Sequence, residues 1–176
     1  GGLVETTGTY LNQTEAYNGT SWTELNNLNT ARNSGAAGGT QTSALFAGGS
    51  GPTAASESWN GTNWTNTPSL NTARQYLTGA MEYGPPGAVA NCESWNGTNW
   101  TEVNDQTNVG GGAAFGTLAT AVKVGDNSTA NRTELWNGTN WSAGTNASVN
   151  VSNRYGLGTS SLGLLAAGEP PNAGVT

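Results

Sequence analysis

The sequence predicts an all-β fold made of four copies of one structural unit. Two observations carry this expectation: an eight-residue motif recurs four times, and each copy contains an Asn-Gly pair that follows an aromatic residue. The motifs end at Trp22, Trp64, Trp100 and Trp141, which gives spacings of 42, 36 and 41 residues. Periods near 40 residues are typical of propeller blades and repeat arrays. No 3.6-residue apolar pattern supports a helical repeat.

Each motif is interpreted as a β-hairpin whose turn is specified by the Asn-Gly pair. In the second copy, Glu57-Ser-Trp-Asn-Gly-Thr-Asn-Trp64, the pair would supply the positive φ angles of a two-residue type I′ turn. That turn pairs Trp59 with Thr62 and Glu57 with Trp64, and it places all four side chains on one face. We therefore expect neighbouring sheets to bury the rings. The residues given this structural role are Trp22, Trp59, Trp64, Trp95, Trp100, Trp136, Trp141, Glu15, Glu57, Glu93, Glu134, Arg32 and Arg74.

Two further strands are expected between successive hairpins. A strand of small residues such as 35–39 comes first, and an apolar strand such as 44–49 follows and ends in glycine. Four strands per repeat is the arrangement of a β-propeller, so the predicted fold is a propeller of four-stranded antiparallel blades. The repeats span approximately 1–47, 48–83, 84–124 and 125–167, with 168–176 a terminal stub, and together they form one propeller domain or segment over 1–176.

The order of the strands predicts how the ring closes. The first hairpin has no inner strands of its own, whereas the apolar strand Leu162–Ala167 has no hairpin after it. We expect this strand to pair with the strand around Thr14–Tyr17, so that both termini complete one blade. Because unpaired strand edges invite association, the alternative is that further repeats or a neighbouring subunit complete the ring.

Composition excludes several classes of function. The net charge of −6 and the pI near 4.3 leave no basic footprint for nucleic acid. No apolar run approaches the roughly 20 residues needed for a membrane span. The chain has no histidine, so it lacks the usual general base and the commonest metal ligand. We therefore expect no catalytic residues, no metal and no cofactor. The single cysteine, Cys92, is interpreted as a small strand residue.

The recurring glutamates and tryptophans also permit functional interpretations. The four glutamates could form a ring of catalytic carboxylates or bind calcium, but bonds to backbone groups or to Arg32, Arg74 and Arg154 explain their fixed position better. The tryptophans could stack against sugars, although blade packing is the default for rings at repeat positions. Binding residues are instead expected in the irregular loops. These candidates are Tyr83, Pro85, Pro86, Glu169 and Pro170.

Several of these features resemble kelch repeats. They are the double glycine Gly48-Gly49, the aromatic pair Trp59 and Trp64, and the segment Thr72-Ala-Arg74. The sequence Glu-Ser-Trp-Asn-Gly-Thr-Asn-Trp-Thr, together with Leu-Asn-Thr-Ala-Arg, also resembles the repeat sequences of kelch-like proteins of marine bacteriophages. That resemblance implies a virion-associated fibre or appendage role. The third repeat departs from the pattern, because Gln106-Thr-Asn-Val-Gly110 stands where Thr-Ala-Arg is expected.

The leading functional expectation is a non-enzymatic structural or adhesive module at an extracellular or virion surface. Its partners would be neighbouring subunits of the assembly and a host-surface glycan, with no nucleic acid and no membrane insertion. The alternative is an intracellular kelch-type platform for protein interactions. A second alternative is an enzyme resembling galactose oxidase, which needs histidine ligands and a Tyr linked to Cys. The absence of histidine argues against it.

Overall fold

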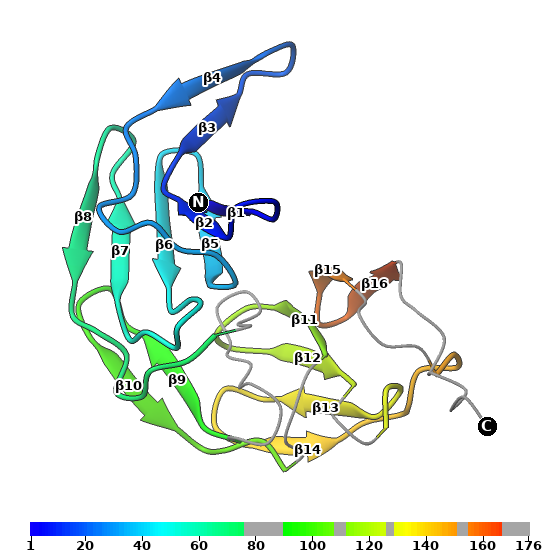
Figure 1. Cartoon of the computed structure of the whole chain (residues 1–176). Helices are drawn as coiled ribbons and strands as arrows, with labels where there is room; N and C mark the ends of the chain where they lie inside the picture. The colour runs from blue at the N-terminus through cyan, green and yellow to red at the C-terminus, as the bar shows by residue number, and fades with distance from the viewer. Residues whose placement is uncertain (76–89, 108–111, 126–128, 151–154, 167–176) are drawn as a thin grey trace. The chain divides into compact units, whose positions relative to one another are not determined.

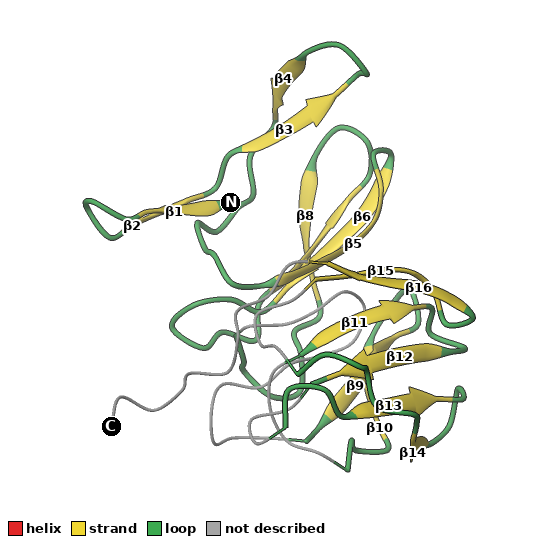
Figure 2. Cartoon of the chain, turned by 90° about the vertical axis from the view of Figure 1, so that its right-hand side faces the viewer, coloured by secondary structure: helices red, strands yellow, loops and turns green. Residues whose placement is uncertain are grey.

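The computed structural model describes residues 1–75, 90–107, 112–125, 129–150 and 155–166. Within these ranges every regular element is a β-strand, as Figure 2 shows. No helix long and apolar enough to cross a membrane occurs among the described residues. The chain separates into two compact units, residues 1–77 with 95–100, and residues 78–94 with 101–176.

The first unit contains one complete four-stranded antiparallel sheet, in the order β5-β6-β7-β8 (Figure 1). A small-residue strand, an apolar strand and a Trp hairpin follow one another in it, as the sequence predicts. Two further hairpins, β1-β2 and β3-β4, are two-stranded sheets of their own. The strands are β1 (Gly2–Val4), β2 (Thr9–Leu11), β3 (Thr14–Tyr17), β4 (Trp22–Leu25), β5 (Ala36–Thr40), β6 (Ser43–Ala47), β7 (Ser56–Trp59) and β8 (Trp64–Thr67).

The second unit repeats the same plan. Its complete antiparallel sheet has the order β11-β12-β13-β14, and β15-β16 is a two-stranded hairpin. The hairpin β9-β10 is also two-stranded, and its residues are divided between the two units. The strands are β9 (Cys92–Trp95), β10 (Trp100–Val103), β11 (Ala113–Gly116), β12 (Ala121–Val124), β13 (Thr133–Trp136), β14 (Trp141–Ala143), β15 (Tyr155–Thr159) and β16 (Leu162–Ala166).

Loop hydrogen bonds recur at equivalent positions of the repeats. The segment after each Trp hairpin is tied back to the segment before that hairpin by one backbone bond. Its four copies run from the amides of Leu28, Leu70, Gln106 and Ala147 to the carbonyls of Asn12, Ala54, Ala90 and Asn131. Because buried backbone groups must find partners, a shared bonding scheme shows that the sequence repeat is also a structural repeat.

The predicted two-residue turn is wrong. Trp59 pairs with Trp64 and Glu57 with Asn66, so four residues, 60–63, connect the strands. A type I′ turn needs positive φ at both central residues. Of the residues in this connection, only Gly61 has a positive φ, at 92°. The Asn60 side chain instead forms a different kind of turn. Its Oδ1 accepts hydrogen bonds from the amides of Thr62 and Asn63, at 2.9 and 2.8 Å, an Asx-type turn.

Glycines in β15 and β16 allow close packing against β11. Phe115 of β11 lies against the β15-β16 hairpin at Gly156 and Gly163. A Cβ atom on Gly156 would lie 2.6 Å from Phe115 Cδ1, and one on Gly163 would clash with the same ring. A larger side chain at either position would therefore force the two sheets apart.

The sheet-level part of the predicted fold is confirmed, whereas ring closure is not. Among the described strands, β3 pairs with β4 alone and β16 pairs with β15 alone. The ladder expected between Leu162–Ala167 and Thr14–Tyr17 is not observed, and no closed propeller is detected. Ala167 itself lies outside the described residues. The β1-β2 hairpin was not anticipated from the sequence.

Candidate functional site

In each Trp hairpin, the two aromatic side chains of the repeat motif face each other across the strands, and their rings are in contact. Trp59 and Trp64 have ring centroids 5.5 Å apart, and the Tyr17–Trp22, Trp95–Trp100 and Trp136–Trp141 pairs lie at 5.2 to 5.4 Å. Tilted pairs at this distance are favourable beyond the area they bury. The rings differ in burial. Trp59, Trp136 and Trp141 are buried and Trp64, Trp95 and Trp100 are half-buried, whereas Trp22 is 66 % exposed.

The second tryptophan of a hairpin reaches back to the previous repeat. Trp64 Nε1 donates to Thr14 Oγ1 at 3.0 Å, and Trp100 Nε1 donates to Ser56 Oγ at 3.3 Å. Thr14 and Ser56 are the first residues of β3 and β7, so they occupy the same repeat position. In these two hairpins the second tryptophan therefore joins consecutive repeats through a specific polar contact as well as through packing.

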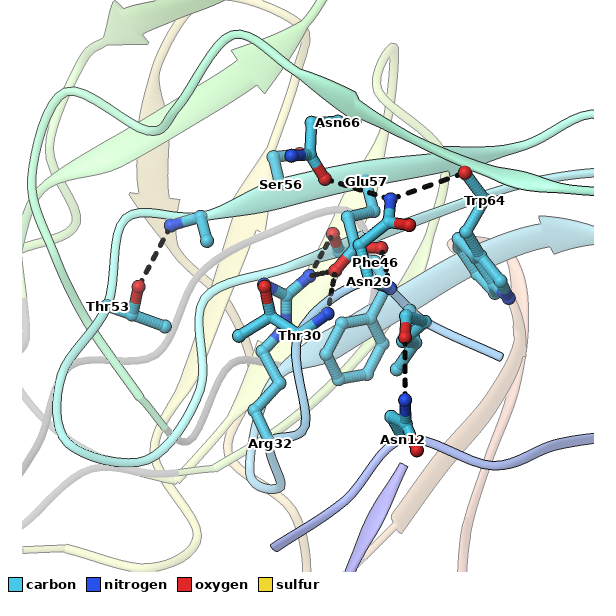
Figure 3. Close-up of polar contacts among 12 residues, drawn as sticks. Asn12, Asn29, Thr30, Arg32, Phe46, Thr53, Ser56, Glu57, Trp64 and Asn66 are labelled. Carbon is cyan, nitrogen blue, oxygen red and sulfur yellow. Dashed lines mark hydrogen bonds and ion pairs between the residues drawn. The ribbon is translucent and has the colours of Figure 1, made fainter. Parts of the chain in front are cut away.

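The carboxylate of Glu57 is buried and bonded by three groups of the preceding repeat (Figure 3). It is 1 % exposed, and it accepts hydrogen bonds from the backbone amides of Asn29 and Thr30, at 2.7 and 3.3 Å. Arg32 Nη2 lies 3.1 Å from Glu57 Oε1 and completes a buried ion pair. Since 29–32 follow the first hairpin and Glu57 belongs to the second, this cluster links two repeats.

Arg32 belongs to the same cluster, and its charged guanidinium loses its hydration there because it is buried. Its guanidinium is 2 % exposed, lies 4.9 Å from the centroid of the Phe46 ring, and donates from Nη2 to Phe46 O at 3.4 Å. Nε and Nη1 are buried without a hydrogen-bond partner. Burial accordingly lowers the pKa of Arg32, while the charge of Glu57 acts in the opposite direction. Glu57 is therefore the counter-charge that makes burial of this arginine tolerable.

A second contact joins the outer hairpins of consecutive repeats. Asn26 Nδ2 donates to Thr62 O at 3.0 Å and to Asn63 Oδ1 at 2.8 Å. Asn104 Nδ2 makes the equivalent bonds to Thr139 O and Asn140 Oδ1, at 3.0 and 2.6 Å. Both asparagines stand four residues after the last Trp of their own motif. Sequence reasoning missed this contact, although aligning the repeats on that Trp reveals the shared asparagine.

The second unit builds its buried carboxylate site differently. Glu134 is 2 % exposed and accepts from the backbone amide of Thr107 at 2.9 Å, the bond that Asn29 makes to Glu57. The preceding repeat, which supplies Thr107, has Gly110 in place of arginine at the Arg32 position. Lys123 instead lies directly opposite Glu134 in the β12-β13 ladder, where Phe46 lies opposite Glu57. This buried lysine, 5 % exposed, brings the positive charge that the missing arginine would supply.

Lys123 is held by a polar side chain at a position that is apolar elsewhere. Gln106 stands where Leu28 and Leu70 are buried in the earlier repeats. Its Oε1 accepts a hydrogen bond from Lys123 Nζ, and its Nε2 donates to Cys92 Sγ at 3.3 Å. The change from Leu to Gln thus accompanies the change from Phe to Lys, because a buried ammonium requires acceptors.

Gln106→Leu, which restores the residue of the other repeats, is expected to destabilise the chain by about 1–3 kcal/mol. It removes an acceptor from a buried ammonium group, and the desolvation penalty is then uncompensated. Urea unfolding gives the free energy of unfolding of each variant. In a Lys123→Met background the same substitution should cost less, because no ammonium remains. Equal costs in the two backgrounds would contradict the pairing of Lys123 with Gln106.

Cys92 is fully buried in the core of the second unit, packed with Ala121, Trp136 and Trp141. Burial raises the pKa of its thiol above the ordinary value. A raised folded-state pKa favours the neutral thiol, so this stabilisation is present below the unfolded-state pKa, about 8.5. It is lost as the pH rises above that value.

The native chain should therefore not react with a thiol reagent at pH 8, and one thiol per chain should appear in denaturant. The free energy of unfolding should also fall above about pH 8.5. Cys92→Ser, which carries the residue found at Ser56, is the control, because its stability should not show this loss. Rapid labelling of the native thiol would contradict the described burial.

The remaining residues assigned from the sequence fall into three groups. Glu93 and Arg74 are buried at 1 % each. Glu15 is exposed, although its repeat equivalents Glu57, Glu93 and Glu134 are buried. The predicted binding residues Tyr83, Pro85, Pro86, Glu169 and Pro170, together with Arg154, lie outside the described residues. The part of the chain that the structure describes contains no group of three or more Cys, Asp or Glu side chains placed to hold a metal ion.

No protein-family model matches this chain, and no curated protein matches it. The interpretation of function therefore depends on the residues and on the geometry of the described repeats.

Proposed function

We propose that this chain is a non-enzymatic structural module of a surface assembly, built as consecutive kelch-like propeller blades. In its leading form it belongs to a fibre or appendage of a phage virion, where it contacts neighbouring subunits or a host-surface glycan. The single observation that carries the proposal is the buried Glu57 cluster. There a repeated carboxylate is fully occupied by two backbone amides and by Arg32 in holding one repeat to the next.

Three further observations support a structural role. Glu134 accepts the equivalent amide bond from Thr107 in the second unit. The indole N–H groups of Trp64 and Trp100 bond hydroxyls of the preceding repeat, so these rings act in packing. A chain with a single lysine and only 9 % charged residues presents a surface rich in neutral polar groups. That composition favours a surface module over an intracellular platform.

Fractionation of the source cells and of the particles that they release tests this proposal. Antibodies raised against the folded chain should detect it in purified particles or on the cell surface. Protease added outside intact cells should then remove the signal. Recovery of the chain only from the protease-protected cell interior would overturn the surface assignment and favour the intracellular interaction platform.

A further inference from the structure

Three chemically reactive side chains gather in the interior of the second unit. Lys123 is 5 % exposed, Gln106 is 8 % exposed and Glu134 is 2 % exposed. Lys123 Nζ donates a hydrogen bond to Gln106 Oε1, and Lys123 lies directly opposite Glu134 in the β12-β13 ladder. A primary amine, a carboxamide and a carboxylate are therefore buried together within one compact unit.

The amine and the carboxamide are placed to react with each other. Oε1 is bonded to Cδ, the carbonyl carbon of the Gln106 side chain, so the hydrogen bond from Lys123 holds Nζ next to that carbon. Rotation of the amide about its last single bond turns Cδ toward Nζ. A desolvated lysine is a nucleophile once it has lost its proton. Holding the two groups in contact replaces a rare encounter in solution.

The carboxylate is placed to move the proton that this reaction must remove. Directly opposite residues of a ladder have Cβ atoms about 4.5–5.5 Å apart, within reach of long side chains. Glu134 Oε1 also accepts from the backbone amide of Thr107 at 2.9 Å, which fixes the carboxylate beside the residue that follows Gln106. Transfer of one proton from Lys123 to Glu134 removes two opposite charges from a place where water solvates neither.

The carboxamide borders the apolar core of the unit. Gln106 Nε2 lies 3.3 Å from Cys92 Sγ. Cys92 belongs to the buried core cluster that also contains Ala121, Trp136 and Trp141. Exclusion of bulk water keeps an amine unsolvated, and an unsolvated amine is the form that attacks a carbonyl carbon.

The first unit shows the same positions without this chemistry. Phe46 lies opposite Glu57 in the β6-β7 ladder, and Leu28 occupies the position of Gln106. In the second unit both positions change, to the amine and to the carboxamide that the reaction needs. An ion pair with Lys123 alone would balance the charge of Glu134, whereas the reaction also requires Gln106.

We propose that Lys123 and Gln106 join in the folded chain through an intramolecular isopeptide bond. Glu134 takes a proton from the Lys123 ammonium, and Nζ then forms a bond to Gln106 Cδ. The Cδ–Nε2 bond breaks. Nε2 leaves as ammonium, with one proton from Nζ and the proton that Glu134 holds. The lysine charge leaves with it, and the reaction needs no oxidant, reductant or cofactor.

The bond fastens two consecutive repeats to each other. Gln106 follows the β9-β10 hairpin, and Lys123 belongs to the four-stranded sheet of the next repeat. The buried Glu57 cluster joins earlier repeats by contacts that open and close, whereas an amide bond stays closed when the chain unfolds. This inference goes beyond the proposed surface role and does not depend on it, because the reaction needs only the folded chain.

The mass of the intact, purified chain is the first test. We expect it to lie below the mass calculated from the sequence by one ammonia molecule. A chain isolated in urea should have the full mass and lose ammonia only after refolding, because the three side chains meet only in the folded state. The full mass in a chain that tryptophan fluorescence shows to be folded overturns the proposal.

Proteolysis of the unfolded chain locates the bond. Trypsin should fail to cleave after Lys123, because an acylated lysine has lost its positive charge. Chymotrypsin cleaves after Phe115, which lies between the two residues in the sequence. It should therefore release two peptides that remain linked, one with Gln106 and one with Lys123. Separate peptides at the full mass overturn the proposal.

Variants distinguish this bond from other reactions that release ammonia. An Asn-Gly pair can close to a succinimide, and the Cys92 thiol could form a thioester with Gln106. Lys123→Met should restore the full mass, whereas Cys92→Ser should keep the loss. A loss that survives Lys123→Met overturns the proposal. A loss that is absent from folded Cys92→Ser, and that hydroxylamine reverses in the unmodified chain, overturns it in favour of the thioester.

Glu134→Gln tests the proton transfer. The amide keeps the shape of the side chain but cannot take a proton, so the release of ammonia during refolding should slow by about 100-fold or more. Glu93→Gln is the matched control, because Glu93 is a buried glutamate at the same repeat position. It should release ammonia at the rate of the unmodified chain. Equal rates in the two folded variants would overturn the role of Glu134.

Discussion

Replacing Glu57 by Gln is expected to lower the free energy of unfolding by about 3–5 kcal/mol, the usual cost of breaking a buried ion pair at one partner. Arg32 and Glu57 are 2 % and 1 % exposed, so the guanidinium that remains has no access to bulk water. The neutral amide also accepts more weakly from the amides of Asn29 and Thr30. Urea unfolding followed by tryptophan fluorescence measures the loss.

The matched control is Glu24→Gln, because Glu24 lies exposed on β4. A surface substitution of this kind changes stability by no more than about 0.5 kcal/mol. Similar effects of the two substitutions would show that Glu57 is solvated in solution. The buried Glu57 cluster would then not hold the repeats together.

Trp59→Ala is expected to cost about 3–5 kcal/mol, the range for truncating a large aromatic side chain in a core. The ring is 5 % exposed, and it contacts Trp64 at a centroid distance of 5.5 Å. Its Nε1 also donates to Gln41 O at 2.9 Å, so truncation leaves that acceptor without its partner. Urea unfolding of the variant measures the loss.

Trp59→Phe separates packing from hydrogen bonding. It keeps an aromatic ring at the position but removes the N–H donor, so the loss should be clearly smaller than for Ala. Equal losses for Phe and Ala would assign the effect to the hydrogen bond. A loss below about 1 kcal/mol for Ala would contradict the buried position of the ring.

The strands of the repeat unit, though not β1 and β2, could be predicted from the sequence because their signals are local. A small-residue segment, an apolar segment ending in glycine, and an aromatic hairpin each specify a strand without reference to the rest of the chain. The prediction of the turn and of its strand register was wrong, although the Asn-Gly signal is also local. An Asn-Gly pair suits a type I′ turn, but the Asn60 side chain bonds the amides of Thr62 and Asn63, and this favours the longer connection.

The polar contacts between repeats were less accessible to prediction. A contact between a repeated arginine and a repeated glutamate, such as that of Arg32 with Glu57, could be predicted because both residues recur with the repeat. The substitution of Lys123 for that arginine could not, because Lys123 lies on β12, whereas Arg32 lies in the loop between β4 and β5. Gln106 is explained only by its contact with Lys123. Such a replacement of one buried charge by another depends on which side chains are in contact in the folded chain. The sequence of a single repeat does not show those contacts.

A double-mutant cycle on Arg32 and Glu57 tests most directly whether polar clusters join consecutive repeats. The cycle compares Arg32→Met, Glu57→Gln and the double variant by urea unfolding. We predict a coupling free energy of roughly 1.5–3 kcal/mol, at the upper end of the range for residues in one buried network. The double variant should then be more stable than the sum of the single losses implies. Effects that add to within about 0.3–0.5 kcal/mol would contradict the account, because independent sites behave in that way.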